Sequence, residues 1–189
     1  AQPRALAEKK VPRRLDGHCR RFIALSPFLA LGTSDAEGRH DVSPRGDRPG
    51  FVRVLDDTTL LIPDRPGNRR FDSLDNIARQ PRLALLFLLP GVDETLRING
   101  RGRTVDEPEL LAPSAVDGKP PLSALLVEIE ECFLHCGKAL IRSRLWDPDT
   151  RIERRSFPSL ARMIADQVAG VDERTADEAI EHAYREKLY

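Results

Sequence analysis

Short apolar runs separated by turn-forming residues are the feature that most constrains the fold of this 189-residue chain. The longest run, Leu83 to Leu89, has the length of one buried strand and is far shorter than the roughly 20 residues that cross a membrane. Strand-like runs recur with turn signals at intervals of about 8–12 residues, a spacing typical of all-β folds. We therefore expect a small antiparallel barrel with helical additions.

Six or seven strands are predicted from alternation or from continuous apolar character. The runs are residues 28–34, 40–43, 51–55, 59–62, 82–89, 95–105 and 122–134. Residues 35–38 and 56–57 predict hairpin turns, and the Pro- and Gly-rich stretch 44–50 predicts a loop. The run 82–89 is apolar on both faces, which predicts a central place in the sheet or barrel.

Helical patterns flank and interrupt these strands. They cover residues 8–24, 69–79, 108–111, 138–146, 159–168 and 172–187. The predicted organisation is an N-terminal helical segment (1–27), a barrel (28–147) and C-terminal helices (148–189) packed on the barrel. The length suits one well-buried domain, so the expected fold is mainly β with α additions.

Composition narrows the range of partners. The 30 Lys and Arg balance the 30 Asp and Glu, so charge gives no reason to expect nucleic acid or a polyanionic surface. Three cysteines do not make a disulfide framework, and neither a secretory signal nor a membrane-spanning run is recognised. The expectation is a cytoplasmic protein that binds no membrane.

The segment 132–136 holds two cysteines and His135, which raises the question of a metal site. Structural zinc sites normally show two well-spaced ligand pairs, and this chain lacks that pattern. Cys132 lies on an alternating strand, where a buried Cys acts as a small apolar residue. We therefore predict no metal, and we place His135 and Lys138 at a strand end near a cofactor or substrate.

The turn Asp64-Arg-Pro-Gly-Asn-Arg-Arg70 carries the strongest functional signal. It follows an apolar run and delivers Arg69 and Arg70 to a helix N-terminus, where N–H groups and the helix dipole favour an anion. Guanidinium groups match a phosphate, and without an anion their charge opposes the dipole. We infer a site for the phosphate of a bound cofactor, to which Ser73 could add a hydroxyl.

Five stretches, one of which includes this turn, resemble in their order and spacing the FMN-binding split-barrel superfamily. Its prototype is pyridoxamine 5′-phosphate oxidase, and the chain is most similar to a bacterial subgroup of oxidase-related, FMN-dependent proteins. The stretches are residues 41–47, 62–70, 72–76, 94–100 and 135–146. They span about residues 28 to 147, most of the chain. The resemblance implies a six- to seven-stranded antiparallel split β-barrel of the FMN-binding type with flanking helices.

The resemblance also implies FMN as the cofactor. Arg69 and Arg70 occupy the place of an Arg-Lys pair that binds the FMN phosphate, and Asn68 stands where a small hydroxyl residue is common. An earlier strand would supply contacts along the edge of the isoalloxazine. The candidates on that strand are Val42, Ser43 and Arg45.

On the later strand the family pattern has a Gln two residues before an Arg, and this chain has Thr95 and Arg97. Thr in place of Gln weakens that contact. Split barrels place FMN in a groove between two subunits, so the resemblance implies a homodimer with shared sites. Trp146, the only Trp, could anchor that interface or cover the partner's flavin, and a core position is the alternative.

The implied activity is flavin-mediated oxidation or reduction of an unidentified small molecule. The prototype ends in a strand whose Arg and His hold the substrate phosphate, whereas this chain continues into two helices. The resemblance therefore supports FMN binding by this chain better than it supports oxidation of pyridoxamine phosphate. The alternatives are a reductase of the same fold acting on haem, a quinone-like acceptor or a deazaflavin, a flavin- or haem-binding redox sensor without turnover, and a phosphate-binding module. No side chain stands out as a catalytic acid or base.

Overall fold

The computed structural model describes residues 12–67, 71–186 and 188–189. These residues form two compact units. The barrel unit holds the described residues up to 64 together with 71–146, and the helical unit holds 65–67 and the described residues from 147 onward. The packing of the C-terminal helices on the barrel therefore stays a prediction.

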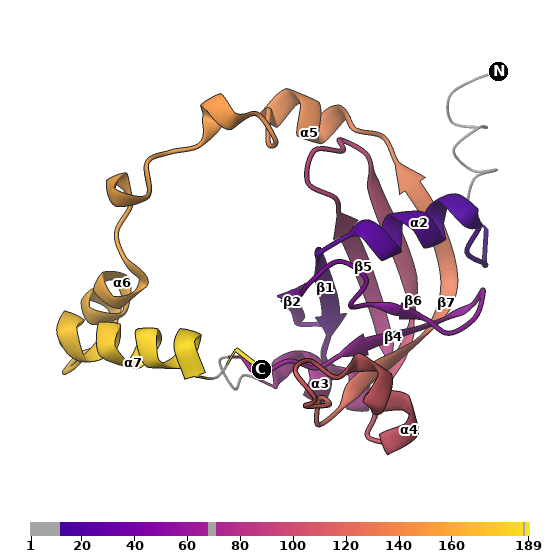
Figure 1. Cartoon of the computed structure of the whole chain (residues 1–189), viewed down its shortest axis with the longest axis horizontal. Coiled ribbons are helices and arrows are strands. Elements are labelled where there is room, and N and C mark those ends of the chain that lie inside the picture. Colours follow the sequence, from indigo (N-terminus) through magenta and orange to yellow (C-terminus); the bar gives the residue numbers. More distant parts are fainter. Residues whose placement is uncertain (1–11, 68–70, 187) are drawn as a thin grey trace. The chain divides into compact units, whose positions relative to one another are not determined.

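One seven-stranded antiparallel sheet makes up the barrel unit, which confirms the predicted fold class (Figure 1). The strand order is β2-β1-β5-β6-β7-β4-β3. The strands are β1 (Phe28–Ser34), β2 (His40–Gly46), β3 (Arg53–Val54), β4 (Thr59–Pro63), β5 (Arg82–Leu88), β6 (Thr95–Val105) and β7 (Ala124–His135). The two predicted hairpins are present as the β1–β2 and β3–β4 pairs.

Four helices belong to the barrel unit and two to the helical unit, among the described residues. In the barrel unit they are α2 (Gly17–Leu25), α3 (Asp72–Arg79), α4 (Pro108–Leu111) and α5 (Lys138–Ser143), and in the helical unit α6 (Leu160–Gln167) and α7 (Glu173–Glu186). Figure 1 shows α2 and α3 at opposite ends of the strands. No helix among the described residues has the length and apolar character needed to cross a membrane.

Alternation along β5 sets the two faces of the sheet. Leu83, Leu85 and Phe87 point inward and are buried with the main core cluster. Leu86 points to the other face and is 39% exposed. The predicted central place of this strand is confirmed, since β5 lies between β1 and β6. Its outward side keeps exposed apolar side chains within the described part of the barrel unit.

Strand β2 extends further than the sequence predicted. The run was expected to end at Ser43 before a loop, yet β2 pairs with β1 as far as Gly46. Pro44 is tolerated within it because β2 is an edge strand, where a missing N–H does not interrupt a ladder on both sides. The prediction of a loop at 44–46 was therefore wrong.

The N-terminal helix starts later than its apolar spacing suggested. Asp16 caps it, and the Asp16 side chain accepts a hydrogen bond from the backbone N–H of Cys19 at 2.8 Å. Residues 12–16 are not helical, and residues 8–11 of the predicted helix lie outside the described part. Cys19, Phe22 and Ile23 form the buried face that packs into the barrel core.

A bulge between Asn99 and Gly100 shifts the register of β6 against β7. A Cβ built on Gly100 would lie 2.1 Å from the backbone oxygen of Glu128, so only glycine fits there. Two residues on, a Cβ on Gly102 would lie 2.6 Å from a methyl group of Leu83. The close approach of backbone and core side chains at these glycines fixes the curvature of the longest strand pair.

Candidate functional site

Helix α3 begins without a side-chain cap among the described residues. Its N-cap position is Phe71, whose side chain is 56% exposed and has no polar atom to accept an N–H. Helix starts normally use Ser, Thr, Asp or Asn there to satisfy one of the free N–H groups. The side chain at the N-cap position therefore satisfies none of the first N–H groups of α3. Asn68, Arg69 and Arg70, predicted to bind phosphate at this point, lie outside the described residues.

Two side-chain hydrogen bonds attach α3 to the sheet. Ser73 Oγ donates to Asp41 Oδ2 on β2 at 2.7 Å, and Asn76 Nδ2 donates to Thr33 Oγ1 on β1 at 3.1 Å. Ser73 is buried, and its hydroxyl, which was predicted to bind the phosphate, is hydrogen-bonded to the Asp41 carboxylate. Asp41, which sequence reasoning did not assign, holds the first turn of the helix in place. Its alternation with Ser43 on β2 was the signal that could have identified it.

Arg45 lies on the inner face of β2 and points into a small pocket. Its Nη1 donates to Asp64 Oδ1 at 2.6 Å, and both side chains are largely buried. Its Nε is buried and has no partner among the described residues. The pocket lining consists of Leu31, Arg45, Ile62, Pro63, Asp64, Leu74 and Leu125. A buried donor normally has an acceptor, so Arg45 Nε is a candidate contact for a ligand in this pocket.

Alternation separates Val42 from the other candidates on β2. Ser43 and Arg45 pair with the buried Leu31 and Leu29 of β1, so they face inward. Val42 faces the opposite side and is 71% exposed. One strand therefore presents its predicted contacts to two surfaces, and only Ser43 and Arg45 are on the side of α3.

A second group of candidates lies where β6 starts and β7 ends. Thr95 and His135 are cross-strand partners, and Arg97 lies opposite Phe133. The guanidinium carbon of Arg97 is 5.6 Å from the Phe133 ring centroid, and the rings of Phe133 and His135 are 5.7 Å apart. Phe133 was missed by sequence reasoning, although the alternation of the strand places it on the same face as His135.

The remaining two candidates follow β7. Lys138 is the first residue of α5 and is exposed. Trp146 is half-buried, and its indole Nε1 donates to the backbone oxygen of Val92 at 2.9 Å. This bond fastens the chain after α5 to the β5–β6 connection. Trp146 thus packs within its own barrel unit, with part of the ring still exposed.

The outer face of the sheet carries an apolar row that crosses five strands. Consecutive cross-strand neighbours in this row are Pro44, Ala30, Leu86, Arg97 and Phe133. Arg97 is its one charged member, and Val42 projects from the same face of the sheet. We call this surface the outer apolar row.

The structure brings no three potential metal ligands together within the part of the chain that it describes. Cys132 points into the core, where its Sγ lies 3.6 Å from that of Cys19. His135 and Cys136 are exposed at the end of the same strand. The side chains of segment 132–136 therefore point in different directions.

Comparison with known proteins places this fold in a family. A family model described as pyridoxamine 5'-phosphate oxidase matches residues 15–136. HupZ of Group A Streptococcus is 16% identical, with a TM-score of 0.51 over 64% of this chain and 93% of that chain. The heme storage protein HutZ from Vibrio cholerae is 14% identical, with a TM-score of 0.39 over 62% and 90%.

An FMN-binding protein from Syntrophomonas wolfei is 12% identical, with a TM-score of 0.44 over 62% of this chain and 88% of that chain. A comparison with curated proteins finds no significant match. The likeness to HupZ shows a shared fold, and the family model covers more than half of the sequence. The chain therefore belongs to the pyridoxamine 5'-phosphate oxidase family.

Proposed function

We propose that this chain binds FMN and acts as an FMN-dependent oxidoreductase on a small molecule. The observation that carries the proposal is the open start of α3, which follows a turn with two arginines in the sequence. Free N–H groups, the helix dipole and two guanidinium groups are what a phosphate monoester needs. When bound, FMN supplies hydride and electron transfer, and the protein supplies position and electrostatics.

Arg45 supports the proposal from the side of the sheet. Asp64 occupies one edge of its guanidinium group and leaves the buried Nε available to an oxygen of the ligand. The carboxylate also offsets the cost of burying the cation before the ligand arrives. Arg45 and the start of α3 border one pocket, because Leu74 of α3 lines it too. We assign these residues to binding and orientation.

The candidates at the start of β6 and the end of β7 could contact the flavin ring or its substrate. Arg97 supplies a cation, Phe133 a ring face and His135 an exposed imidazole. A cation near the pyrimidine edge of a flavin stabilises the reduced anion. Thr95, Arg97 and His135 lie at the opposite end of the strands from α3. A site that uses both groups is therefore best completed by a second chain.

We propose accordingly a homodimer with the cofactor site at the subunit interface. Leu86 of the outer apolar row and Val42 on the same face of the sheet are exposed. Covering this row with a second copy would bury that surface and bring Arg97 of one subunit towards the flavin of the other. Trp146 keeps an exposed part that could join such an interface.

The substrate is proposed to differ from pyridoxamine 5′-phosphate. After β7 the described residues form helices and turns with no further strand, and the family model ends at residue 136. The substrate-binding strand of the prototype has no counterpart in that part of the chain. Assay with oxygen as acceptor should give slow or no formation of pyridoxal phosphate, and turnover of about 1 s⁻¹ or faster would contradict this.

The decisive test compares FMN with riboflavin, which lacks the phosphate. Fluorescence titration of the Arg69→Ala, Arg70→Ala double variant should show at least about a tenfold loss of FMN affinity, with riboflavin little changed. Arg79→Ala, at the other end of α3, is the matched control and should bind FMN normally. Equal losses for both ligands would show that the arginines do not contact the phosphate. An absorbance spectrum dominated by haem would favour the haem-binding alternative.

A further inference from the structure

Two buried cysteines from distant parts of the sequence meet in the barrel core. Cys19 on α2 and Cys132 on β7 are 113 residues apart, and their sulfur atoms are 3.6 Å apart. Both are free thiols with almost no exposed surface. They lie away from the start of α3, and the proposed flavin chemistry uses neither. A third cysteine, Cys136, is exposed and gives an internal reference.

The chain that covers this pair is the segment 12–16. The backbone N–H of Cys132 donates to the carbonyl oxygen of Pro12 at 2.9 Å, and the Arg14 carbonyl oxygen lies 3.6 Å from Cys132 Sγ. Leu15 N–H donates to the Asp57 carbonyl oxygen at 2.7 Å. Among the described residues, this non-helical segment is the layer that covers the pair on this side.

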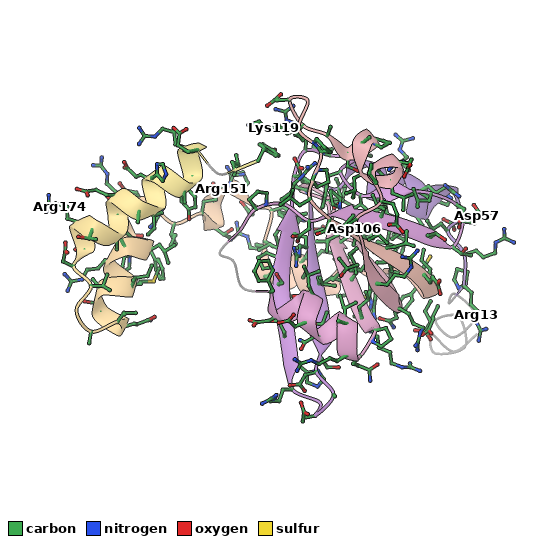
Figure 2. The ribbon with its side chains drawn as sticks, turned by 90° about the horizontal axis from the view of Figure 1, so that it is seen from below. Arg13, Asp57, Asp106, Lys119, Arg151 and Arg174 are labelled. Carbon is green, nitrogen blue, oxygen red and sulfur yellow. The ribbon has the colours of Figure 1, made fainter. Side chains whose placement is uncertain are left out.

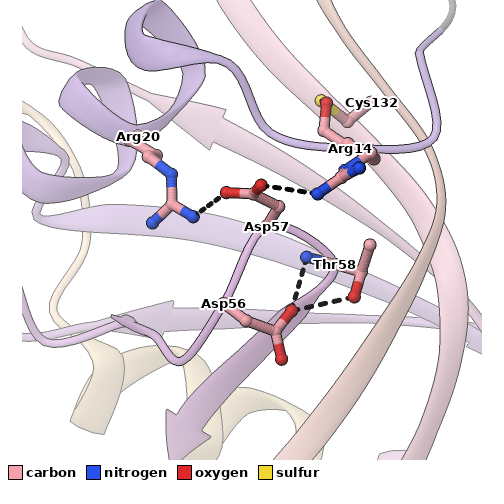
Figure 3. Close-up of polar contacts among 6 residues, drawn as sticks. All are labelled: Arg14, Arg20, Asp56, Asp57, Thr58 and Cys132. Carbon is pink, nitrogen blue, oxygen red and sulfur yellow. Dashed lines mark hydrogen bonds and ion pairs between the residues drawn. The ribbon is translucent and has the colours of Figure 1, made fainter.

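Ion pairs at the surface hold this layer down (Figure 3). The Asp57 carboxylate accepts from Arg14 Nη2 at 2.8 Å and from Arg20 Nη2. The side chains of Arg14 and Asp57 are 71% and 43% exposed, so these pairs are weak and are screened by salt. Local opening of such a segment costs far less than global unfolding.

We propose that Cys19 and Cys132 form a reversible disulfide, and that the ion pairs of Asp57 with Arg14 and Arg20 limit the access of oxidant to it. Closing the bond requires the sulfur atoms to approach from 3.6 Å to about 2.0 Å, a movement within reach of side-chain rotation. The matching oxidant is a low-molecular-weight disulfide small enough to enter beneath segment 12–16.

The roles of the two thiols differ. The hydrogen bond shared by the sulfurs raises the pKa of Cys19, and burial and the nearby Asp16 raise it further. The same bond lowers the pKa of Cys132, although burial opposes this. Cys132 also lies directly beneath segment 12–16, with its Sγ 3.6 Å from the Arg14 carbonyl oxygen, so a disulfide that enters there meets it first. We therefore assign Cys132 as the first nucleophile and Cys19 as the resolving thiol.

The exchange conserves atoms and electrons. The Cys132 thiolate attacks one sulfur of the small disulfide, a mixed disulfide forms, and one small thiolate leaves. Cys19 loses its proton and attacks the Cys132 sulfur, so that the protein S–S bond forms and the second small thiolate leaves. The two cysteine protons end on the two small thiols, and two electrons pass from the protein to the small disulfide.

The test uses full-length protein carrying Cys136→Ser. This background is needed because residues 132–136 contain no Lys or Arg, so Cys132 and Cys136 share one tryptic peptide. After native protein is incubated with oxidised glutathione, peptide mass spectrometry should find Cys19 linked to Cys132, and reductant should remove the link. Adding Cys19→Ser should stop the reaction at a glutathione adduct on Cys132.

The access claim is tested by adding Asp57→Asn to the same background. The cross-link should form about two- to fivefold faster at low salt, and raised salt should bring the two proteins to the same rate. Equal rates at low salt would overturn the role of Asp57. Recovery of both buried thiols unmodified, under conditions that fully modify Cys136 in the wild-type protein, would overturn the disulfide itself.

Discussion

Asp57 joins two parts of the barrel unit at the surface of the protein. Figure 2 shows Asp57 at the edge of the barrel unit. Its carbonyl oxygen accepts from Leu15 and its carboxylate binds Arg14 and Arg20 (Figure 3), so one turn residue between β3 and β4 holds both the N-terminal segment and α2. Hydrogen bonds from Arg20, and then from Arg14, hold the pKa of Asp57 below its ordinary value of 3.8. A lowered pKa means that folding favours the charged carboxylate.

Replacing Asp57 with Asn should therefore lower stability in a way that depends on pH. The Asp57 contribution is fully present above pH 3.8, the ordinary value, and is lost as pH falls through the lower pKa of the folded state. Urea unfolding should show a lower midpoint for the variant at about pH 7 and a converging midpoint at about pH 3. Asp106→Asn, an exposed aspartate between β6 and α4, is the control. A difference between the two unfolding midpoints that grows as pH falls would contradict a stabilising role of the Asp57 carboxylate.

At the scale of one element, the proposed phosphate site depends on how α3 is held against the sheet. Its far side is fixed to the sheet by Ser73 and Asn76, while its first residue follows an N-cap with no polar side chain. A helix held in place does not need a cap of its own to stay folded. In the proposed site, the first turn of this helix binds the phosphate without rearrangement.

This reasoning predicts a charge effect at Phe71. Asp and Asn can both cap a helix, but only Asp adds a negative charge at the place proposed for the phosphate. Phe71→Asp should bind FMN about fivefold or more weakly than Phe71→Asn at low salt, with equal riboflavin affinity. Phe71 is exposed, so neither change disturbs the core. Isothermal titration of both variants is the measurement, and equal FMN affinities would place the phosphate elsewhere.

Local patterns predicted most elements, and long-range contacts explain the misses. The strands 28–34 and 95–105 were predicted with their observed bounds because alternation and turns mark them clearly. The strand through Pro44 was missed because only its edge position makes a proline acceptable there. The Arg45–Asp64 pair joins β2 to the residue after β4. No periodicity in either segment encodes that contact.

For the whole molecule, the question is what covers the outer face of the sheet. The barrel hides one side of β5 completely and leaves the other side with Leu86 and Ala84 exposed. Apolar side chains in a cross-strand row on a central strand are unusual for a face that meets only water. We proposed a second copy of the chain as the occupant, because it would also complete the proposed site.

Leu86→Glu should therefore separate the subunits. Leu86 points away from the core, so the variant should keep its fold while a buried charge in the interface prevents association. Light scattering should give twice the 21.2-kDa chain mass for the wild-type protein and the single mass for the variant. Leu122→Glu, at a highly exposed loop position, is the matched control and should stay dimeric. A monomeric wild-type protein would remove the shared site.

The proline in β2 has a further consequence for the life of the protein in solution. β2 is one end of the strand order, so its outer side is open to pairing with strands of other molecules. Pro44 leaves one position of this strand without a donor, which makes the row of hydrogen-bonding groups discontinuous. An intruding strand would find no continuous ladder to extend. The residue that obscured the strand in the sequence thus also protects the folded chain from aggregation along its free edge.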